Sequence, residues 1–88
     1  MIKAWSEQAW GDYLNWHRLD EVKWNKINEL LKDIERHPFT GIGKPEPLKK
    51  LKGWWSRRIT EEHRLIYRVS GMGGEQKIEI LSCCNHYD

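Results

Sequence analysis

The chain has 88 residues, of which 39% are hydrophobic and 32% charged, and its net charge is +2. This length fits one domain, and the composition is close to ordinary globular usage, which excludes general disorder. No stretch approaches the about 20 consecutive apolar residues that span a bilayer, and the first residues lack the apolar core of a signal peptide. We therefore predict a single domain over residues 1–88, in the cytoplasm and without a membrane anchor.

Two kinds of side chain stand out in the composition. Six tryptophans bring a large apolar area to a short chain, and we expect them to help build the core. The two cysteines, Cys83 and Cys84, are adjacent, so they provide no disulfide framework. Together with His86 they lie too close in sequence to close a tetrahedral metal site readily. We expect no metal and no other cofactor.

The first half of the chain predicts a strand and two helices. Residues 1–5 are short and apolar-leaning, and Ser6 can cap a helix that follows them. Asp20 can cap a second helix, whose apolar positions recur at helical spacing from residue 24 to residue 34. Pro38 ends this second helix.

The second half predicts a loop and three strands. Residues 40–47 contain two glycines and two prolines and indicate a stiff, extended loop. Strands are predicted over residues 51–60, 63–70 and 77–83, with short connections that favour an antiparallel meander. Because the helices and the meander are segregated along the chain, we predict an α+β fold.

Alternation along the predicted strands assigns side chains to two faces of the sheet. Leu65, Tyr67 and Val69 share one face and are expected to pack on the helices, together with Trp55 and Ile59 from the preceding strand. The opposite, open face is then expected to carry Ile66, an exposed Trp54 that can stack a base, and the arginines Arg58, Arg64 and Arg68. Arg57 falls on the inward face, where a charge is awkward, so we expect either that it lies near the end of the strand or that a bulge re-aims it.

The basic residues are concentrated in one part of the chain. Residues 44–68 hold eight Lys or Arg and three Glu, a net charge of +5, whereas the remaining residues carry −3. A basic segment of this kind suits a polyanion, although a solvated Lys/Arg surface has the same composition. A basic face with an aromatic side chain fits single-stranded nucleic acid.

Few groups near this face can move protons: Glu46, His63 and the pair His86-Tyr87. Cleavage of RNA by its own 2′-OH needs a base, an acid and positive charge on the phosphate. Glu46 and His86 can supply the base and the acid, and Arg64 the charge. The alternatives are a solvated loop carboxylate, a surface histidine, and arginines that pair with glutamates across strands. For His63 a packing or edge role is the better interpretation.

Three separated motifs resemble those of a known family: residues 44–49 (KPEPLK), residues 55–67 (WSRRITEEHRLIY) and His86-Tyr87. They are similar to the YoeB/Txe toxins of bacterial toxin–antitoxin modules. The likeness extends upstream through residues 5–7 (WSE), 26–30 (KINEL) and 38–41 (PFTG), so it covers essentially the whole chain.

The resemblance implies a RelE-like microbial-RNase fold and an endoribonuclease that enters the ribosomal A site on the 30S subunit and cuts mRNA without metal, leaving a 2′,3′-cyclic phosphate. It implies a cognate antitoxin of the YefM/Axe kind and a homodimer. It also implies a general base at Glu46, a transition-state stabiliser at Arg64, a general acid at His86 and an orienting side chain at Tyr87. Phosphate contacts are implied at Lys49 and Arg58, to which the basic segment and the open face add Lys50, Lys52 and Trp54.

The sequence also departs from the family pattern. Asp88 follows the terminal His-Tyr pair, and Cys84 stands where the family often has Arg, so rate and pH dependence are expected to differ. Two other functions stay open: a relative that poisons another target, as gyrase-directed ParE-like toxins do, and a plain RNA-binding module.

Overall fold

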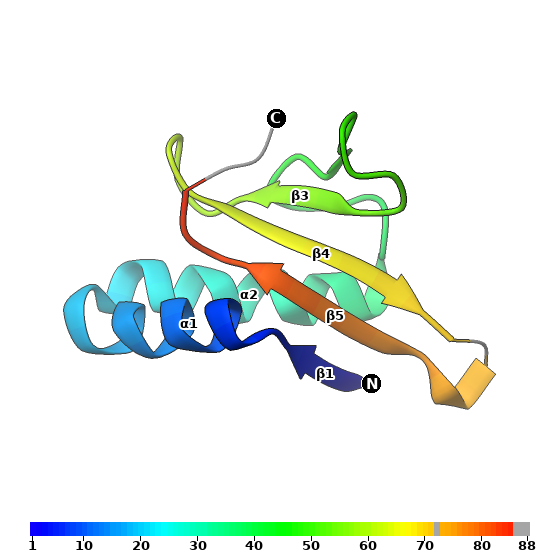
Figure 1. Ribbon diagram of the computed structural model, residues 1–88, viewed down its shortest axis with the longest axis horizontal. Coiled ribbons are helices and arrows are strands. Elements are labelled where there is room, and N and C mark those ends of the chain that lie inside the picture. Colours follow the sequence, from blue (N-terminus) through cyan, green and yellow to red (C-terminus); the bar gives the residue numbers. More distant parts are fainter. Residues whose placement is uncertain (72, 86–88) are drawn as a thin grey trace.

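The computed structural model of the protein describes residues 1–71 and 73–85. Its elements follow the chain in the order β1 (Ile2–Trp5), α1 (Glu7–Leu19), α2 (Glu21–Arg36), β2 (Glu46–Pro47), β3 (Trp55–Arg58), β4 (Arg64–Ser70), the 3-10 turn η1 (Gly73–Glu75) and β5 (Lys77–Ser82). Helix α2 lies behind β4 and β5 in the view of Figure 1. The predicted α+β fold is confirmed.

The strands form one mixed sheet in the order β1-β5-β4-β3-β2. Strands β3, β4 and β5 make the predicted antiparallel meander, and β1 pairs in parallel with β5. Two predictions need correction. The stiff loop contains the short edge strand β2, and the strand predicted over residues 51–60 begins only at Trp55, because Leu51 and Trp54 close a turn around Gly53 at φ +89°.

Both helix starts are where the sequence predicts them. The Ser6 side chain accepts a hydrogen bond from the Ala9 amide at 3.0 Å, which caps α1. The Asp20 side chain accepts one from the Lys23 amide at 3.3 Å and caps α2. Each cap satisfies an amide that has no partner inside its helix. The second helix ends at Arg36, just before Pro38, as expected.

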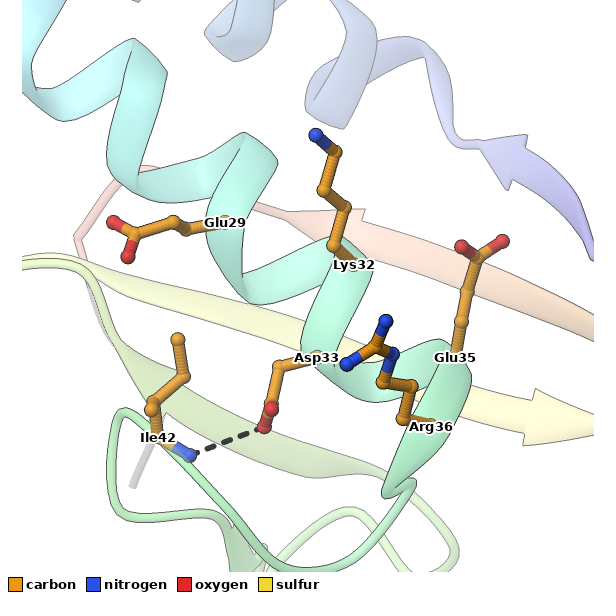
Figure 2. Close-up of a pocket in the computed structure, with 6 residues that line it drawn as sticks. All are labelled: Glu29, Lys32, Asp33, Glu35, Arg36 and Ile42. Carbon is orange, nitrogen blue, oxygen red and sulfur yellow. Dashed lines mark hydrogen bonds between the residues drawn. The ribbon is translucent and has the colours of Figure 1, made fainter.

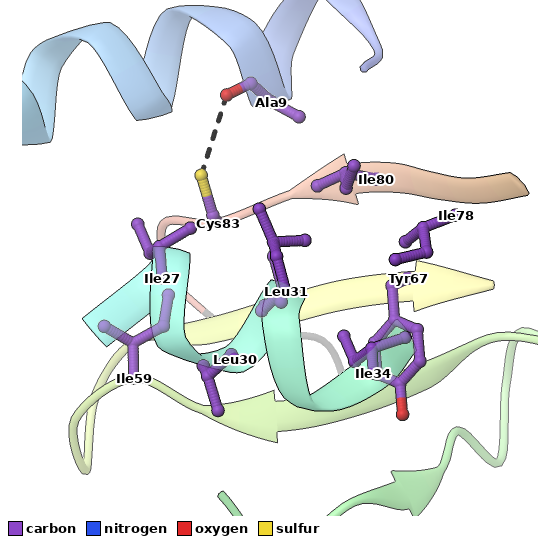
Figure 3. Packing of buried hydrophobic residues seen from close by; sticks show 11 residues of the cluster. Ala9, Ile27, Leu30, Leu31, Ile34, Ile59, Tyr67, Ile78, Ile80 and Cys83 are labelled. Carbon is purple, nitrogen blue, oxygen red and sulfur yellow. Dashed lines mark hydrogen bonds between the residues drawn. The ribbon is translucent and has the colours of Figure 1, made fainter. Parts of the chain in front are cut away.

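The core lies between α2 and the inner face of the sheet (Figure 3). The apolar stripe of α2 consists of Ile27, Leu30, Leu31 and Ile34. It packs against every second residue of two strands, Leu65 and Tyr67 on β4 and Ile78 and Ile80 on β5. Burial of such side chains stabilises the fold by roughly 1.5–3 kcal/mol each. The inward positions predicted from β4 are confirmed, with Val69 half-buried. The tryptophans surround this core rather than fill it, and Trp10 is exposed.

Arg57 lies next to the last residue of β3, as one of the two expectations had it, but no bulge re-aims it, and it stays fully buried on the inner face. Its guanidinium donates to the Asp33 carboxylate at 2.6 Å and to the carbonyl oxygens of His37, Thr40 and Ile42. Its Nε donates to the Tyr67 hydroxyl at 3.2 Å. A buried charge is tolerated when it is paired and hydrogen-bonded in this way.

The Asp33 carboxylate also accepts a hydrogen bond from the Ile42 amide, at 3.1 Å (Figure 2). Arg57 and Asp33 therefore tie the end of α2 to the segment that leads into β2. Gly43 in this segment has φ +79°, and a Cβ there would lie 2.7 Å from Leu30 Cδ2, so only glycine fits. Within residues 1–71 and 73–85, no helix is both long and apolar enough to cross a membrane.

Changing Asp33 to Asn should destabilise the fold, because the Arg57 charge then keeps only neutral acceptors. We expect a loss of about 1.5–3 kcal/mol in the free energy of unfolding, the range for hydrogen bonds to charged groups. Urea denaturation at pH 7 measures this loss. The exposed Glu29 on the same helix provides the control: Glu29→Gln should change stability by less than about 0.5 kcal/mol. Equal effects of the two substitutions would contradict the role given to Asp33.

The same pair predicts an acid dependence. The hydrogen bond from Arg57 is the main reason that the pKa of Asp33 lies below its usual value. The ionised Asp33 carboxylate stabilises the fold fully above its unfolded-state pKa of about 4. This stabilisation is lost as the pH falls through the lower pKa that Asp33 has in the folded state. Wild type should therefore lose part of its stability below about pH 4, and Asp33→Asn should lose less over the same range.

Candidate active site

Three predicted site residues lie on the face of the sheet that points away from the helices, which we call the outer face. Glu46 on β2 pairs with Ser56 on β3, and Arg58 pairs with Arg64 on β4. Cross-strand partners point to the same side of a sheet. Since Arg57 points inward, its neighbours Ser56 and Arg58 point outward. Their cross-strand partners Glu46 and Arg64 therefore point outward as well.

These three charges have no ion-pair partner within 4 Å among the residues that the structure describes. Glu46 is exposed, whereas Arg58 and Arg64 are half-buried. The Arg58 Nε atom is buried and finds no acceptor in the described part of the chain. Arg58 and Arg64 are also like charges directly opposite each other on neighbouring strands, an arrangement that destabilises a sheet.

The centre of the outer face is not open. Ser56, Ile66 and Ser82 pair across β3, β4 and β5, and all three are buried. The prediction that this face is open along its length is therefore wrong. The accessible charges lie toward its β2 edge and toward the start of β4.

Trp54 is half-buried rather than exposed, which corrects a second expectation. The Arg68 guanidinium lies 4.5 Å from the centroid of the Trp54 ring, so it covers one aromatic face. Arg68 itself donates to Glu79 at 2.7 Å. This hydrogen bond lowers the pKa of Glu79 and raises that of Arg68, so both stay charged at neutral pH. Arg68 is thus paired, unlike the two other arginines of the outer face.

The predicted phosphate contacts of the basic segment lie between β2 and β3. Lys49, Lys50 and Lys52 are all exposed there. The Leu48 amide donates to the Trp54 carbonyl at 2.9 Å and closes the base of this loop. Three exposed cations therefore lie in the loop that follows β2, the edge strand that carries Glu46.

The C-terminal pair His86-Tyr87 lies outside the described residues, but the residue before it is placed. The carbonyl of Asn85 accepts from the Arg64 amide at 2.8 Å, and the Asn85 amide donates to His63 Nδ1 at 2.9 Å. Sequence reasoning gave His63 only a packing role. The one signal for this contact is weak: asparagine tolerates the left-handed backbone that Asn85 adopts at φ +62°.

The cysteines form no site in the described chain. Both are free thiols, and burial raises the pKa of the Cys83 thiol to about 12, so it stays protonated and makes a poor nucleophile or ligand. Across the described ranges, no cluster of three His, Cys, Asp or Glu side chains is arranged to hold a metal ion.

A depression beside α2 contains none of the predicted site residues (Figure 2). It is lined by three acids (Glu29, Asp33 and Glu35), two bases (Lys32 and Arg36) and Ile42. Mixed charges of this kind give no preference for an anion, in contrast to the outer face.

Comparisons with known proteins agree with the motifs in the sequence. Residues 5–87 match the family model described as "YoeB-like toxin of bacterial type II toxin-antitoxin system". The chain is 55% identical to Toxin YoeB of Escherichia coli (strain K12), over 99% of this chain and 100% of that protein.

Solved structures give the same result. A "YoeB/ParE toxin from Agrobacterium tumefaciens" superposes with a TM-score of 0.93 at 50% identity, over 99% of this chain and 100% of that one. The YoeB dimer from Staphylococcus aureus superposes with a TM-score of 0.89 at 46% identity, over 99% of this chain and 98% of that one. The toxin of the same organism was also solved as a heterotetrameric YoeB-YefM complex. The RelBE2 complex of Mycobacterium tuberculosis, at 23% identity and a TM-score of 0.66, shares the fold alone (97% and 96%), which confirms the RelE-like prediction. The protein therefore belongs to the YoeB-like toxins of bacterial type II toxin–antitoxin systems.

Proposed function

We propose that this toxin is a ribosome-dependent mRNA endoribonuclease, which cuts mRNA in the A site of the 30S subunit in the cytoplasm and so blocks translation. The observation that carries the proposal is that Glu46, Arg58 and Arg64 share the outer face of the sheet. A carboxylate that can accept a proton stands on the same face as two arginines that have no acidic partner in the described chain.

The reaction is an internal transesterification. Glu46 takes the proton from the 2′-OH, whose oxygen forms a bond to phosphorus while the bond from phosphorus to the 5′ oxygen breaks. Arg64 stabilises the charge that builds up on the phosphate, and its planar fork suits two phosphate oxygens. His86 gives a proton to the leaving 5′ oxygen, and Tyr87 orients the reacting group. The products are a 2′,3′-cyclic phosphate and a 5′-hydroxyl, and protein side chains carry both proton transfers.

The unpaired state of Arg58 supports an anionic substrate. Its buried Nε lacks an acceptor in the described chain, and an unsatisfied buried donor costs about 1–3 kcal/mol. A phosphate between Arg58 and Arg64 removes this penalty and the repulsion between them. Lys49, Lys50 and Lys52 extend the positive surface, and the half-buried Trp54 adds an aromatic side chain next to Arg68.

The size of the protein supports dependence on the ribosome. A chain of 88 residues offers few contacts with which to orient a flexible RNA. Correct positioning can supply about 7–11 kcal/mol of the barrier. The ribosome provides that positioning when it holds the mRNA in its A site. Comparable cleavage of naked RNA would count against this part of the proposal.

Two protein partners are part of the proposal. The Staphylococcus aureus relative was solved with YefM and as a dimer. The identity of 46% over 99% of this chain supports a YefM/Axe-like antitoxin and a homodimer for this toxin as well. The competing functions, a gyrase-directed toxin or a plain RNA binder, do not need a carboxylate beside the arginines.

Changing Glu46 to Ala should lower the cleavage rate by about 10²–10⁴-fold, the usual contribution of a general base. Primer extension on mRNA in a purified translation system, with and without ribosomes, measures the cuts. Glu75→Ala is the matched control, because Glu75 is an exposed carboxylate on η1. We expect A-site cuts that need ribosomes, persist in Glu75→Ala and disappear in Glu46→Ala.

The outcome separates the three functions. Undiminished cuts in Glu46→Ala would show that this carboxylate is not the base. Blocked translation without any cuts would instead indicate a toxin that binds another target. RNA binding without cuts and without a translation block would indicate a plain RNA-binding module.

Replacing Lys49, Lys50 and Lys52 together by Gln should weaken the salt dependence of RNA binding. Each cation that neutralises a phosphate of a single strand contributes about 0.7 to the slope of log K against log salt, so the slope should fall by about 2. Fluorescence anisotropy with a single-stranded RNA over a KCl series measures it. Removing three cations from α2 (Lys26, Lys32 and Arg36) controls for net charge and should leave the slope unchanged.

A further inference from the structure

The segment that follows β5 is held by hydrogen bonds from two different elements. The Cys83 amide donates to the Asp12 carboxylate on α1 at 3.1 Å. The Trp16 indole N–H, also on α1, donates to the Cys83 carbonyl at 2.8 Å. Two residues later, both backbone groups of Asn85 are bound by the start of β4. The chain is therefore fixed twice within three residues, just before its last part.

Asn85 is the last of these fixed points. Its carbonyl accepts the Arg64 amide at 2.8 Å, and its amide donates to His63 Nδ1 at 2.9 Å. Its φ of +62° lies in the left-handed region, which asparagine tolerates better than most residues. Of its two contacts, only the one with His63 depends on a side chain, and a substitution can remove it.

We propose that His63 is a positioning residue, whose Nδ1 atom holds the Asn85 amide and so sets the point from which the chain continues to His86 and Tyr87. Asn85 directly precedes His86 in the sequence, and consecutive Cα atoms are about 3.8 Å apart. The inference rests on the proposed function, which gives those side chains their roles. His63 itself touches no reacting atom.

The contact requires a particular state of the His63 ring. A backbone amide can only donate, so Nδ1 must be unprotonated and the ring proton must sit on Nε2. Protonation of Nδ1 places two donors against each other and breaks the contact. The edge of the ring also packs on Trp16, with centroids 4.9 Å apart, and this packing helps fix its orientation.

Charged groups of both signs surround the ring. Asp12 faces it from α1, Lys23 from α2, and Glu61 and Glu62 from the turn before β4. Burial raises the pKa of Asp12, while the Cys83 hydrogen bond and the charge of His63 oppose that shift.

The contact is tested by nuclear magnetic resonance on the full-length wild-type toxin. The ¹⁵N shifts of the His63 ring should show a protonated Nε2 and an accepting Nδ1 at neutral pH. The Asn85 amide resonance should move with the protonation of that ring as pH falls. An Asn85 amide that does not respond would overturn the inference, whatever the activity.

The positioning role is tested with two variants in the ribosome-dependent primer-extension assay. His63→Leu keeps an apolar body but removes the acceptor, and we expect cleavage at saturating toxin to fall by about 10–100-fold, as small misplacements of reacting groups do. His63→Asn places an oxygen acceptor near the position of Nδ1 and should restore most of that loss. Ribosome binding should be unchanged in both variants.

A pH series separates His63 from His86. Both variants keep His86, so the ratio of wild-type to His63→Asn rates reports only on the ring at position 63. We expect this ratio to fall toward acid pH. Full activity in His63→Leu, or equal losses in the two variants, would overturn the positioning role. If wild type does not cut mRNA at all while the Asn85 amide still follows the ring, the proposed function fails, and the positioning role fails with it although the contact stands.

Discussion

The buried Arg57 guanidinium is the interaction on which the rest of the structure depends. Its charge lies on the inner face of the sheet, where it would be strongly unfavourable without partners. The Asp33 carboxylate, three carbonyl oxygens and the Tyr67 hydroxyl provide those partners and come from α2, the following segment and β4. Because the segment after α2 leads into β2, the network that binds its carbonyls also sets the approach of Glu46 to the sheet edge. The Arg58 amide completes the link by donating to the Gly43 carbonyl at 2.7 Å.

The two faces of the sheet treat arginine in opposite ways. On the inner face Arg57 has a full set of acceptors and serves stability. On the outer face Arg68 is paired with Glu79, but Arg58 and Arg64 stand opposite each other without an acid in the described chain. Like charges in this position cost stability, and a phosphate removes that cost. The same strand thus carries a structural arginine and, one residue later, an arginine suited to an anion, because alternate residues of a strand face opposite sides.

Much of the fold could be predicted from local signals. Ser6 and Asp20 cap helices whose apolar spacing identifies them, and the alternation of Leu65 and Tyr67 assigns the buried face of β4. The errors have a different origin. The strand β2 carries a proline and is two residues long, so its own composition does not predict it, and it forms only because the intervening loop brings it against β3. The exposure assigned to Trp54 failed for the same reason, since Arg68 covers the ring from another strand.

The sequence by itself determined the two helices with their caps, the strands other than β2, the concentration of positive charge and the family, because each of these rests on neighbouring residues or on motifs read in order. Only the tertiary structure decided which charges are satisfied. Arg57, Arg58 and Arg64 look alike in sequence, yet one is buried in a closed network, whereas the other two lack an acidic partner in the described chain. The contact between His63 and Asn85 likewise joins residues that are 22 positions apart. Hydrogen bonds need atoms within about 3 Å, and that proximity is set by the packing of the whole chain rather than by any local pattern.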